Sequence, residues 1–105
     1  MLDKTDRMND LLDWYENRLT ENQRLIATLY YREDYSLSEI SENTKTSRSA
    51  VHDSLQRSEL ILEELESQLG IVKRYHKRLK YYGMLRALNI ESVSKILDEL
   101  EKCDE

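Results

Sequence analysis

Six polar residues between positions 45 and 57 have the types and the spacing needed to contact nucleic acid: Lys45, Arg48, Ser49, His52, Gln56 and Arg57. In a helix, residues three or four positions apart share one side, and this would bring the group from Arg48 onward together, with Asp53 beside it. Arg can form paired hydrogen bonds with guanine and Gln with adenine, while Ser and His can reach base edges or phosphates. Lys45 and Arg57 flank the group, where contacts to phosphates would set the orientation of the protein.

A second group of cations lies at residues 71–86. This segment holds six Lys or Arg and no Asp or Glu, whereas residues 1–70 sum to −7 and residues 87–105 to −4, giving the net charge of −5. A basic block between acidic segments is a candidate surface for an anionic partner. Its cations are interleaved with tyrosines, a mixture that suits RNA through stacking and phosphate attraction. This secondary patch comprises Lys73, Arg74, Lys77, Arg78 and Lys80.

The basic block has two other interpretations. Tyr75 and Tyr82 share an apolar stripe with Leu79 at helical spacing, which favours core packing over base stacking for these two rings. The cations could also meet an acidic surface of another subunit. Such a surface is expected on the preceding helix, which carries four glutamates: Glu59, Glu63, Glu64 and Glu66.

The sequence lacks the residue groups that catalysis, metal binding or a cofactor would need. His52 and His76 have no Cys, Asp or Glu at ligand spacing, and Cys103 is the single cysteine. Gly70 and Gly83 are the only glycines, so there is no glycine-rich phosphate loop. We therefore expect no metal site, no cofactor and no enzyme activity. The absence of a long apolar run or a signal pattern leads us to expect a cytoplasmic protein without a membrane span.

The composition predicts an all-α fold. The chain has 105 residues, no Pro, two Gly and 35% charged residues, which is typical of joined helices and not of a turn-rich β-sandwich. Apolar periodicity and breaks predict six helices: Thr5–Leu19, Thr20 to about residue 34, Leu37–Asn43, Arg48–Leu69, a basic helix from Ile71 that Gly83 interrupts, and Ser92–Glu101.

Local signals mark where these helices begin and end. Thr20 with Gln23, and Ser36 with Glu39, form the pattern of a capping box. Ser47 is suited to begin the fourth helix, and Gly70 to end it. The apolar faces are predicted to carry Met8, Leu11, Leu12, Tyr15 and Leu19 in the first helix; Leu25, Ile26, Leu29 and Tyr30 in the second; Leu37 and Ile40 in the third; and Val93, Ile96, Leu97 and Leu100 in the last.

The fourth helix carries a short heptad seam made of Val51, Leu55, Ser58, Leu62, Leu65 and Leu69. The seam can pack within the chain or form a dimer contact, and its short length favours packing within the chain. Residues 36–57, two helices joined by a short polar turn, have the form of a helix-turn-helix. We expect residues 1–70 to form a helix-turn-helix domain, with the basic helix and C-terminal helix of residues 71–105 packed on it.

Six segments carry a family resemblance: residues 4–9 (KTDRMN), 19–24 (LTENQR), 29–31 (LYY), 34–40 (DYSLSEI), 47–53 (SRSAVHD) and 57–63 (RSELILE). Over residues 4–69 the chain resembles the YlxM family of small bacterial helix-turn-helix proteins, which are similar to region 4 of sigma factors. Where the family usually has a turn such as Gly-Val-Ser, this chain has Lys45-Thr46-Ser47.

The resemblance implies a role linked to the signal recognition particle, because members are typically encoded beside the particle's GTPase or its receptor. We expect a regulatory or accessory protein that binds duplex DNA or signal recognition particle RNA through the helix-turn-helix, with the GTPase as a possible partner. The alternative is a protein-binding adaptor or homodimer in which the helix-turn-helix is structural only.

Overall fold

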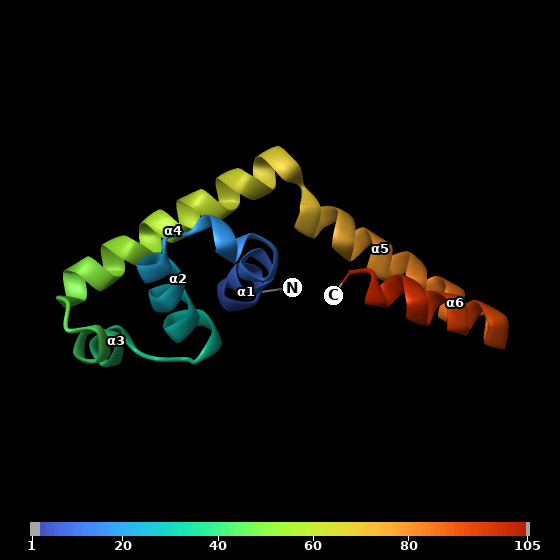
Figure 1. The fold of residues 1–105 in the computed structure, drawn as a ribbon, viewed down its shortest axis with the longest axis horizontal. Helices are drawn as coiled ribbons and strands as arrows, with labels where there is room; N and C mark the ends of the chain where they lie inside the picture. The colour runs from blue at the N-terminus through green and yellow to red at the C-terminus, as the bar shows by residue number, and fades with distance from the viewer. Residues whose placement is uncertain (1–2, 105) are drawn as a thin grey trace. The chain divides into compact units, whose positions relative to one another are not determined.

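The computed structural model describes residues 3–104, which form six α-helices and no strand, and this confirms the predicted all-α fold. The chain divides into two compact units (Figure 1). Residues 3–72 are called the helix-turn-helix unit below, and residues 73–104 the C-terminal hairpin. No helix of the described part is long and apolar enough to cross a membrane.

The first helix of the helix-turn-helix unit, α1, spans Lys4–Tyr15. Asp3 begins it by accepting a hydrogen bond from the Asp6 backbone N–H. The helix ends earlier than predicted, because a 3₁₀ turn follows at Glu16–Arg18. The five residues predicted to face inward here are all buried: Met8, Leu11, Leu12, Tyr15 and Leu19.

The second helix, α2, spans Glu21–Ala27 and runs into a π-helical turn at Thr28–Arg32. The predicted capping box of Thr20 and Gln23 is confirmed, with both reciprocal hydrogen bonds present. The predicted inward face is partly wrong, because Leu25 is 47% exposed while Ala27 and Tyr31 are buried. Ala27 carries little weight in an apolar pattern, and a π turn has wider spacing than an α-helix, so the pattern could not locate this face correctly.

The helix-turn-helix consists of α3, Leu37–Thr44, and α4, Arg48–Leu69. The second capping box, Ser36 with Glu39, is confirmed. Ser47 accepts a hydrogen bond from the Ala50 N–H at 3.1 Å, and Gly70 ends α4 in the left-handed conformation, as the sequence predicts. In Figure 1, α3 lies near the first turn of α4, and α2 crosses α4 further along.

One core holds the helix-turn-helix unit together. Ile40 of α3 and Val51 of α4 are completely buried in it, beside residues of α1 and α2. The heptad seam of α4 packs into this core at Val51, Leu55, Ser58 and Leu62, which confirms packing within the chain at these positions, whereas Leu69 is exposed. The core therefore fixes which side of α4 faces outward.

The C-terminal hairpin contains most of α5, Ile71–Arg86, and all of α6, Glu91–Lys102. The predicted break at Gly83 is wrong, because α5 continues through this residue. A glycine inside a helix costs only about 1 kcal/mol. The two helices lie side by side (Figure 1), and Arg86 pairs with Asp98 at 2.9 Å and Glu101 at 3.1 Å. Leu97 is the one buried apolar residue of the described hairpin.

Candidate nucleic-acid interface

The turn between α3 and α4 is held by side-chain hydrogen bonds. The Ser41 hydroxyl donates to the Thr46 carbonyl at 2.5 Å, and the Thr44 hydroxyl to the Ile40 carbonyl at 2.7 Å. Lys45 ends α3 with a φ of 56°, in the left-handed region that favours glycine. This chain therefore makes the turn with a lysine at the left-handed position, and the Lys45 side chain is exposed there.

All six residues predicted to contact nucleic acid are exposed. The structure places Lys45 in the turn and the other five on the first three turns of α4: Arg48, Ser49, His52, Gln56 and Arg57. The five α4 residues lie outside the stripe that Val51 and Leu55 bury in the core, with Arg48 on the side of α3 and Arg57 on the side of α2. The fold thus leaves this surface, called the α4 face below, open for another molecule.

The cations of the α4 face carry uncompensated charge. Among residues 3–104, none of Lys45, Arg48 and Arg57 forms an ion pair or hydrogen bond through its side chain. By contrast, Lys4 pairs with Glu59 at 3.0 Å, and Arg7 with Glu63 at 2.7 Å. Arg32 pairs with both Asp13 and Glu16. Three of the unit's cations without an ion pair therefore lie at the turn and on the first three turns of α4.

Grooves run along two sides of the α4 face. One is shallow and is lined by Leu37, Arg48, Ser49, His52 and Asp53. Another brings the start of α2 beside α4 and is lined by Thr20, Asn22, Gln23, Ala50, Asp53, Ser54 and Arg57. The contribution of α2 could not be predicted from the sequence, because residues some thirty positions apart share no periodic signal. Thr20, Asn22 and Gln23 add polar groups beside the Arg57 guanidinium.

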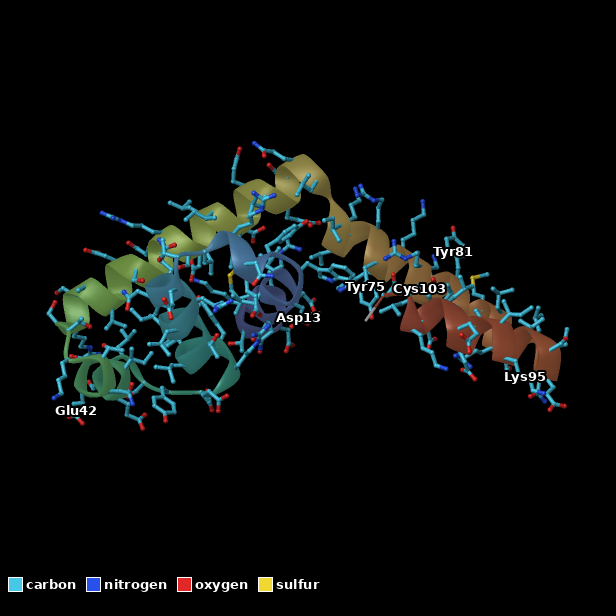
Figure 2. The ribbon with its side chains drawn as sticks, viewed as in Figure 1. Asp13, Glu42, Tyr75, Tyr81, Lys95 and Cys103 are labelled. Carbon is cyan, nitrogen blue, oxygen red and sulfur yellow. The ribbon has the colours of Figure 1, made fainter. Side chains whose placement is uncertain are left out.

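Acidic groups are also exposed on α3 and α4. Asp53 is exposed and lines both grooves. Glu42 extends from α3 into solvent, as Figure 2 shows. A carboxylate repels a phosphate but can accept a hydrogen bond from the amino group of cytosine. An anion would therefore be attracted by the flanking cations and repelled by Asp53.

The prediction of an acidic surface on α4 is largely wrong, because three of its four glutamates have partners within the chain. Glu59 and Glu63 are paired with α1, and Glu66 is buried, where it accepts hydrogen bonds from the Tyr15 hydroxyl and the Val72 N–H. Glu59 also accepts from the Tyr31 hydroxyl. Only Glu64 of the four is exposed, and it contacts Gln68 on its own helix.

The secondary basic patch is less uniform than the sequence suggests. Arg78 pairs with Asp104 at 3.2 Å and lies over the Tyr75 ring, and Arg86 pairs with α6. Lys73 and Arg74 are exposed at the start of the hairpin, as are Lys77 and Lys80 further along α5. The hairpin thus directs part of its positive charge toward α6. Tyr75 and Tyr82 are half-buried, in line with packing rather than free stacking surfaces.

Comparisons with known proteins extend the resemblance beyond the motifs. Residues 2–101 match the model of the UPF0122 family, described as helix-turn-helix proteins, YlxM / p13 like. The YlxM protein of Bacillus subtilis is 38% identical over 108 residues, covering 98% of both chains. A UPF0122 protein of Anoxybacillus flavithermus is 44% identical over 110 residues, covering 99% of this chain and all of the relative. A UPF0122 protein of Exiguobacterium sibiricum is 40% identical over 104 residues, covering 95% of this chain and 98% of the relative. The similarity therefore reaches through α6, whereas the sequence motifs alone stop at residue 69.

Proposed function

The chain belongs to the YlxM / p13 like helix-turn-helix family, and from this membership and the α4 face we propose that it binds nucleic acid through α4. In helix-turn-helix proteins, the second helix enters the major groove with its first residues toward the bases. Arg48, Ser49 and His52 occupy those first turns here. Gln56 is exposed one turn after His52, and Arg57 is exposed on the other flank of α4, beside the start of α2.

The observation that carries this proposal is the combination of exposure and unpaired charge. The helix-turn-helix unit is acidic overall, so binding to phosphates requires its cations to be concentrated and free. Three of them, at Lys45, Arg48 and Arg57, meet that requirement within the described residues. The N-terminal turn of α4 also has no acidic residue, so the helix dipole favours an anion there.

We place this binding in the pathway of the signal recognition particle, on the basis of the family resemblance. The protein then acts in the cytoplasm as a regulatory or accessory factor, by binding and without catalysis. Its nucleic-acid partner is duplex DNA or the particle's RNA, and the particle's GTPase is a further partner.

Fluorescence anisotropy with labelled duplex DNA and labelled particle RNA, in the same low-salt buffer, tests the proposal and separates the two ligands. We expect one of them to bind, and Arg48→Ala with Arg57→Ala to weaken binding at least tenfold. The matched control, Arg18→Ala with Lys95→Ala, removes the same charge from exposed sites outside the α4 face and should bind nearly as the wild type does. Equal loss in both double variants would mean that net charge alone drives binding.

The adaptor function is a second candidate, favoured by the apolar surface of the C-terminal hairpin. Binding of neither nucleic acid at low salt, together with recovery of the tagged protein with the targeting GTPase from its own cells, would support the adaptor. Loss of nucleic-acid binding only when Lys73, Arg74, Lys77 and Arg78 are neutralised would move the site to α5.

A further inference from the structure

A cavity lies beside the α4 face, between four segments of the helix-turn-helix unit. Its lining comes from α1, from the π turn at Thr28–Arg32, from the first residue of α3 and from α4. Its volume is about 210 Å³, which is smaller than the roughly 300 to 1,000 Å³ of pockets that hold drug-sized ligands. The cavity therefore has room for one small ring system and not for a larger ligand.

The opening of the cavity belongs partly to the α4 face. His52 and Gln56 are exposed residues of that face, and both line the cavity. Lys4 and Thr5 are the exposed lining residues on α1. Because the exposed lining residues mark the opening, the cavity opens between α1 and α4, at the edge of the α4 face. A nucleic acid that binds the α4 face would therefore lie next to this opening.

The inner lining of the cavity is aromatic and apolar. Tyr31 and Leu55 are each 5% exposed and form its floor, while Tyr30 and Leu37 are half-buried. The rings of Tyr30 and Tyr31 meet edge to face, with their centroids 4.9 Å apart. Proteins that bind unpaired nucleotides hold the bases on aromatic side chains of this kind, since every base has a flat apolar face. The lining therefore suits a nucleobase.

Glu59 adds a hydrogen-bond acceptor with free capacity to this lining. Its Oε1 atom accepts a hydrogen bond from the Tyr31 hydroxyl and pairs with the Lys4 ammonium at 3.0 Å. Its Oε2 atom has no hydrogen bond or ion pair within residues 3–104. An ionised carboxylate only accepts hydrogen bonds, so it selects a ligand that carries N–H groups. The Watson–Crick edge of an unpaired guanine presents two neighbouring N–H groups, which makes guanine the best match among the bases.

The π turn that supplies the two tyrosines is fixed by hydrogen bonds. The Asn9 side-chain amide donates to the Tyr31 carbonyl at 3.1 Å, and the Glu33 N–H donates to the Thr28 carbonyl at 3.0 Å. The Tyr31 hydroxyl is held by Glu59. Such turns are rare and occur frequently at functional sites. The cavity is therefore formed before a ligand arrives, so binding does not require these rings to be ordered first.

We propose that this cavity binds one unpaired base of a structured RNA, an inference that rests on the function proposed for the α4 face. The base enters beside α4, packs against Tyr30 and Leu37, and donates an N–H group to Glu59 Oε2. The phosphate of the same nucleotide stays at the opening, near the Lys4 side chain, which is 68% exposed.

The need for an unpaired base distinguishes RNA from duplex DNA as the ligand. Folded RNA offers unpaired bases in loops and bulges. Duplex DNA keeps its bases paired and stacked, and extruding one of them costs the free energy of unpairing and unstacking. A protein that uses both the α4 face and the cavity should therefore prefer a structured RNA.

Fluorescence anisotropy with two labelled RNA hairpins tests this inference. The hairpins are identical except that their single bulged nucleotide carries guanine in one and no base in the other. We expect the guanine hairpin to bind about tenfold more tightly, in line with the usual contribution of stacking one base on an aromatic ring. Equal binding of the two hairpins would overturn the cavity proposal and leave the function of the α4 face standing. Binding of neither hairpin would also overturn it, and binding of duplex DNA would then decide separately whether the α4 face contacts nucleic acid.

Two pairs of variants show whether the preference for guanine arises in the cavity. Thr5→Met fills the opening with a longer, uncharged side chain that has no ring, and should abolish the preference while the hairpin without the base binds as before. The matched control, Ser38→Met, lies at an exposed site of α3 outside the cavity and should keep the preference. Tyr30→Leu should lose the preference, whereas Tyr30→Phe retains the ring and should keep it.

Circular dichroism of each variant checks that the helices are intact. An undiminished preference in folded Thr5→Met, or the same loss in Ser38→Met, would contradict binding of the base in this cavity.

Discussion

The Tyr15 hydroxyl donates a 2.6 Å hydrogen bond to Glu66 Oε1, and this contact joins the end of α1 to the end of α4 inside the helix-turn-helix unit. The same hydroxyl accepts a hydrogen bond from the Ile71 N–H at 3.1 Å, and the same carboxylate oxygen accepts one from the Val72 N–H at 3.0 Å. Two buried side chains thus hold the last residues of the unit in place and satisfy two backbone donors at the start of α5.

Replacing Tyr15 by Phe should destabilise the protein by about 1.5 to 3 kcal/mol, the usual contribution of a hydrogen bond to a charged group. The change removes only the hydroxyl and leaves Glu66 buried with one partner fewer. Urea unfolding measures the loss. Tyr30→Phe is the control, because the Tyr30 hydroxyl makes no hydrogen bond within residues 3–104, and it should change stability by less than about 0.5 kcal/mol. Similar losses in both variants would show that the Tyr15 contact is unimportant.

Stability should fall at alkaline pH because of two buried tyrosines. Burial, helped by hydrogen bonds to Glu66 and Glu59, raises the pKa of Tyr15 and of Tyr31 above the usual value of 10.0. Above pH 10 the unfolded chain releases these protons while the folded chain keeps them, so the free energy of unfolding decreases by up to about 2.7 kcal/mol per pH unit for two groups. Below pH 10 this contribution is fully present. Urea titrations between pH 9 and pH 11 measure the slope, which Tyr31→Phe should roughly halve and Tyr81→Phe, at an exposed ring, should not alter.

Lys45→Gly should stabilise the protein and weaken its binding to nucleic acid. The left-handed φ of 56° costs a lysine about 1 to 2 kcal/mol, and the greater freedom of glycine in the unfolded chain offsets part of the gain. We expect a net increase of about 0.5 to 1 kcal/mol in the free energy of unfolding. Lys45→Ala removes the same charge without the backbone gain, so it should lower the affinity equally and leave the protein less stable than Lys45→Gly. A glycine variant less stable than the alanine variant would contradict the described turn.

Gly83→Ala should stabilise the C-terminal hairpin by about 0.5 to 1 kcal/mol. Gly83 lies within the continuous helix α5, where glycine is the less favourable residue, and a Cβ atom added there meets nothing within 4 Å. Thermal unfolding of the full chain detects the gain. The control is Ala87→Gly in the turn after α5, which should not stabilise the protein. A loss of stability on Gly83→Ala would mean that α5 bends or is tightly covered at this position.

Short-range signals made most of the helix-turn-helix predictable from the sequence. The capping residues Thr20, Ser36 and Ser47 each act on a backbone group three positions away, so their effect can be derived without knowing the fold. The outward side of α4 follows from the spacing of Val51 and Leu55. Exposure of the candidate binding residues could therefore be expected before the structure was known.

Contacts between distant segments account for the features that could not be predicted from the sequence. Arg7 and Glu63 are 56 positions apart, and nothing in the periodicity of either helix indicates that they pair. The carboxylates of α4 therefore looked like a free acidic surface. Leu25 was misplaced for a related reason, since the π turn and the small Ala27 determine which side of α2 meets the core.

The salt dependence of binding tests the role of the α4 face most directly. For the nucleic acid that binds, the logarithm of the association constant should fall linearly with the logarithm of the salt concentration. Each phosphate contact adds about one to the slope, so Arg48→Ala with Arg57→Ala should reduce its magnitude by about two. The pair Arg18→Ala with Lys95→Ala should keep the wild-type slope. A slope and affinity unchanged by the loss of Arg48 and Arg57 would contradict the account, because these guanidinium groups would then lie outside the contact.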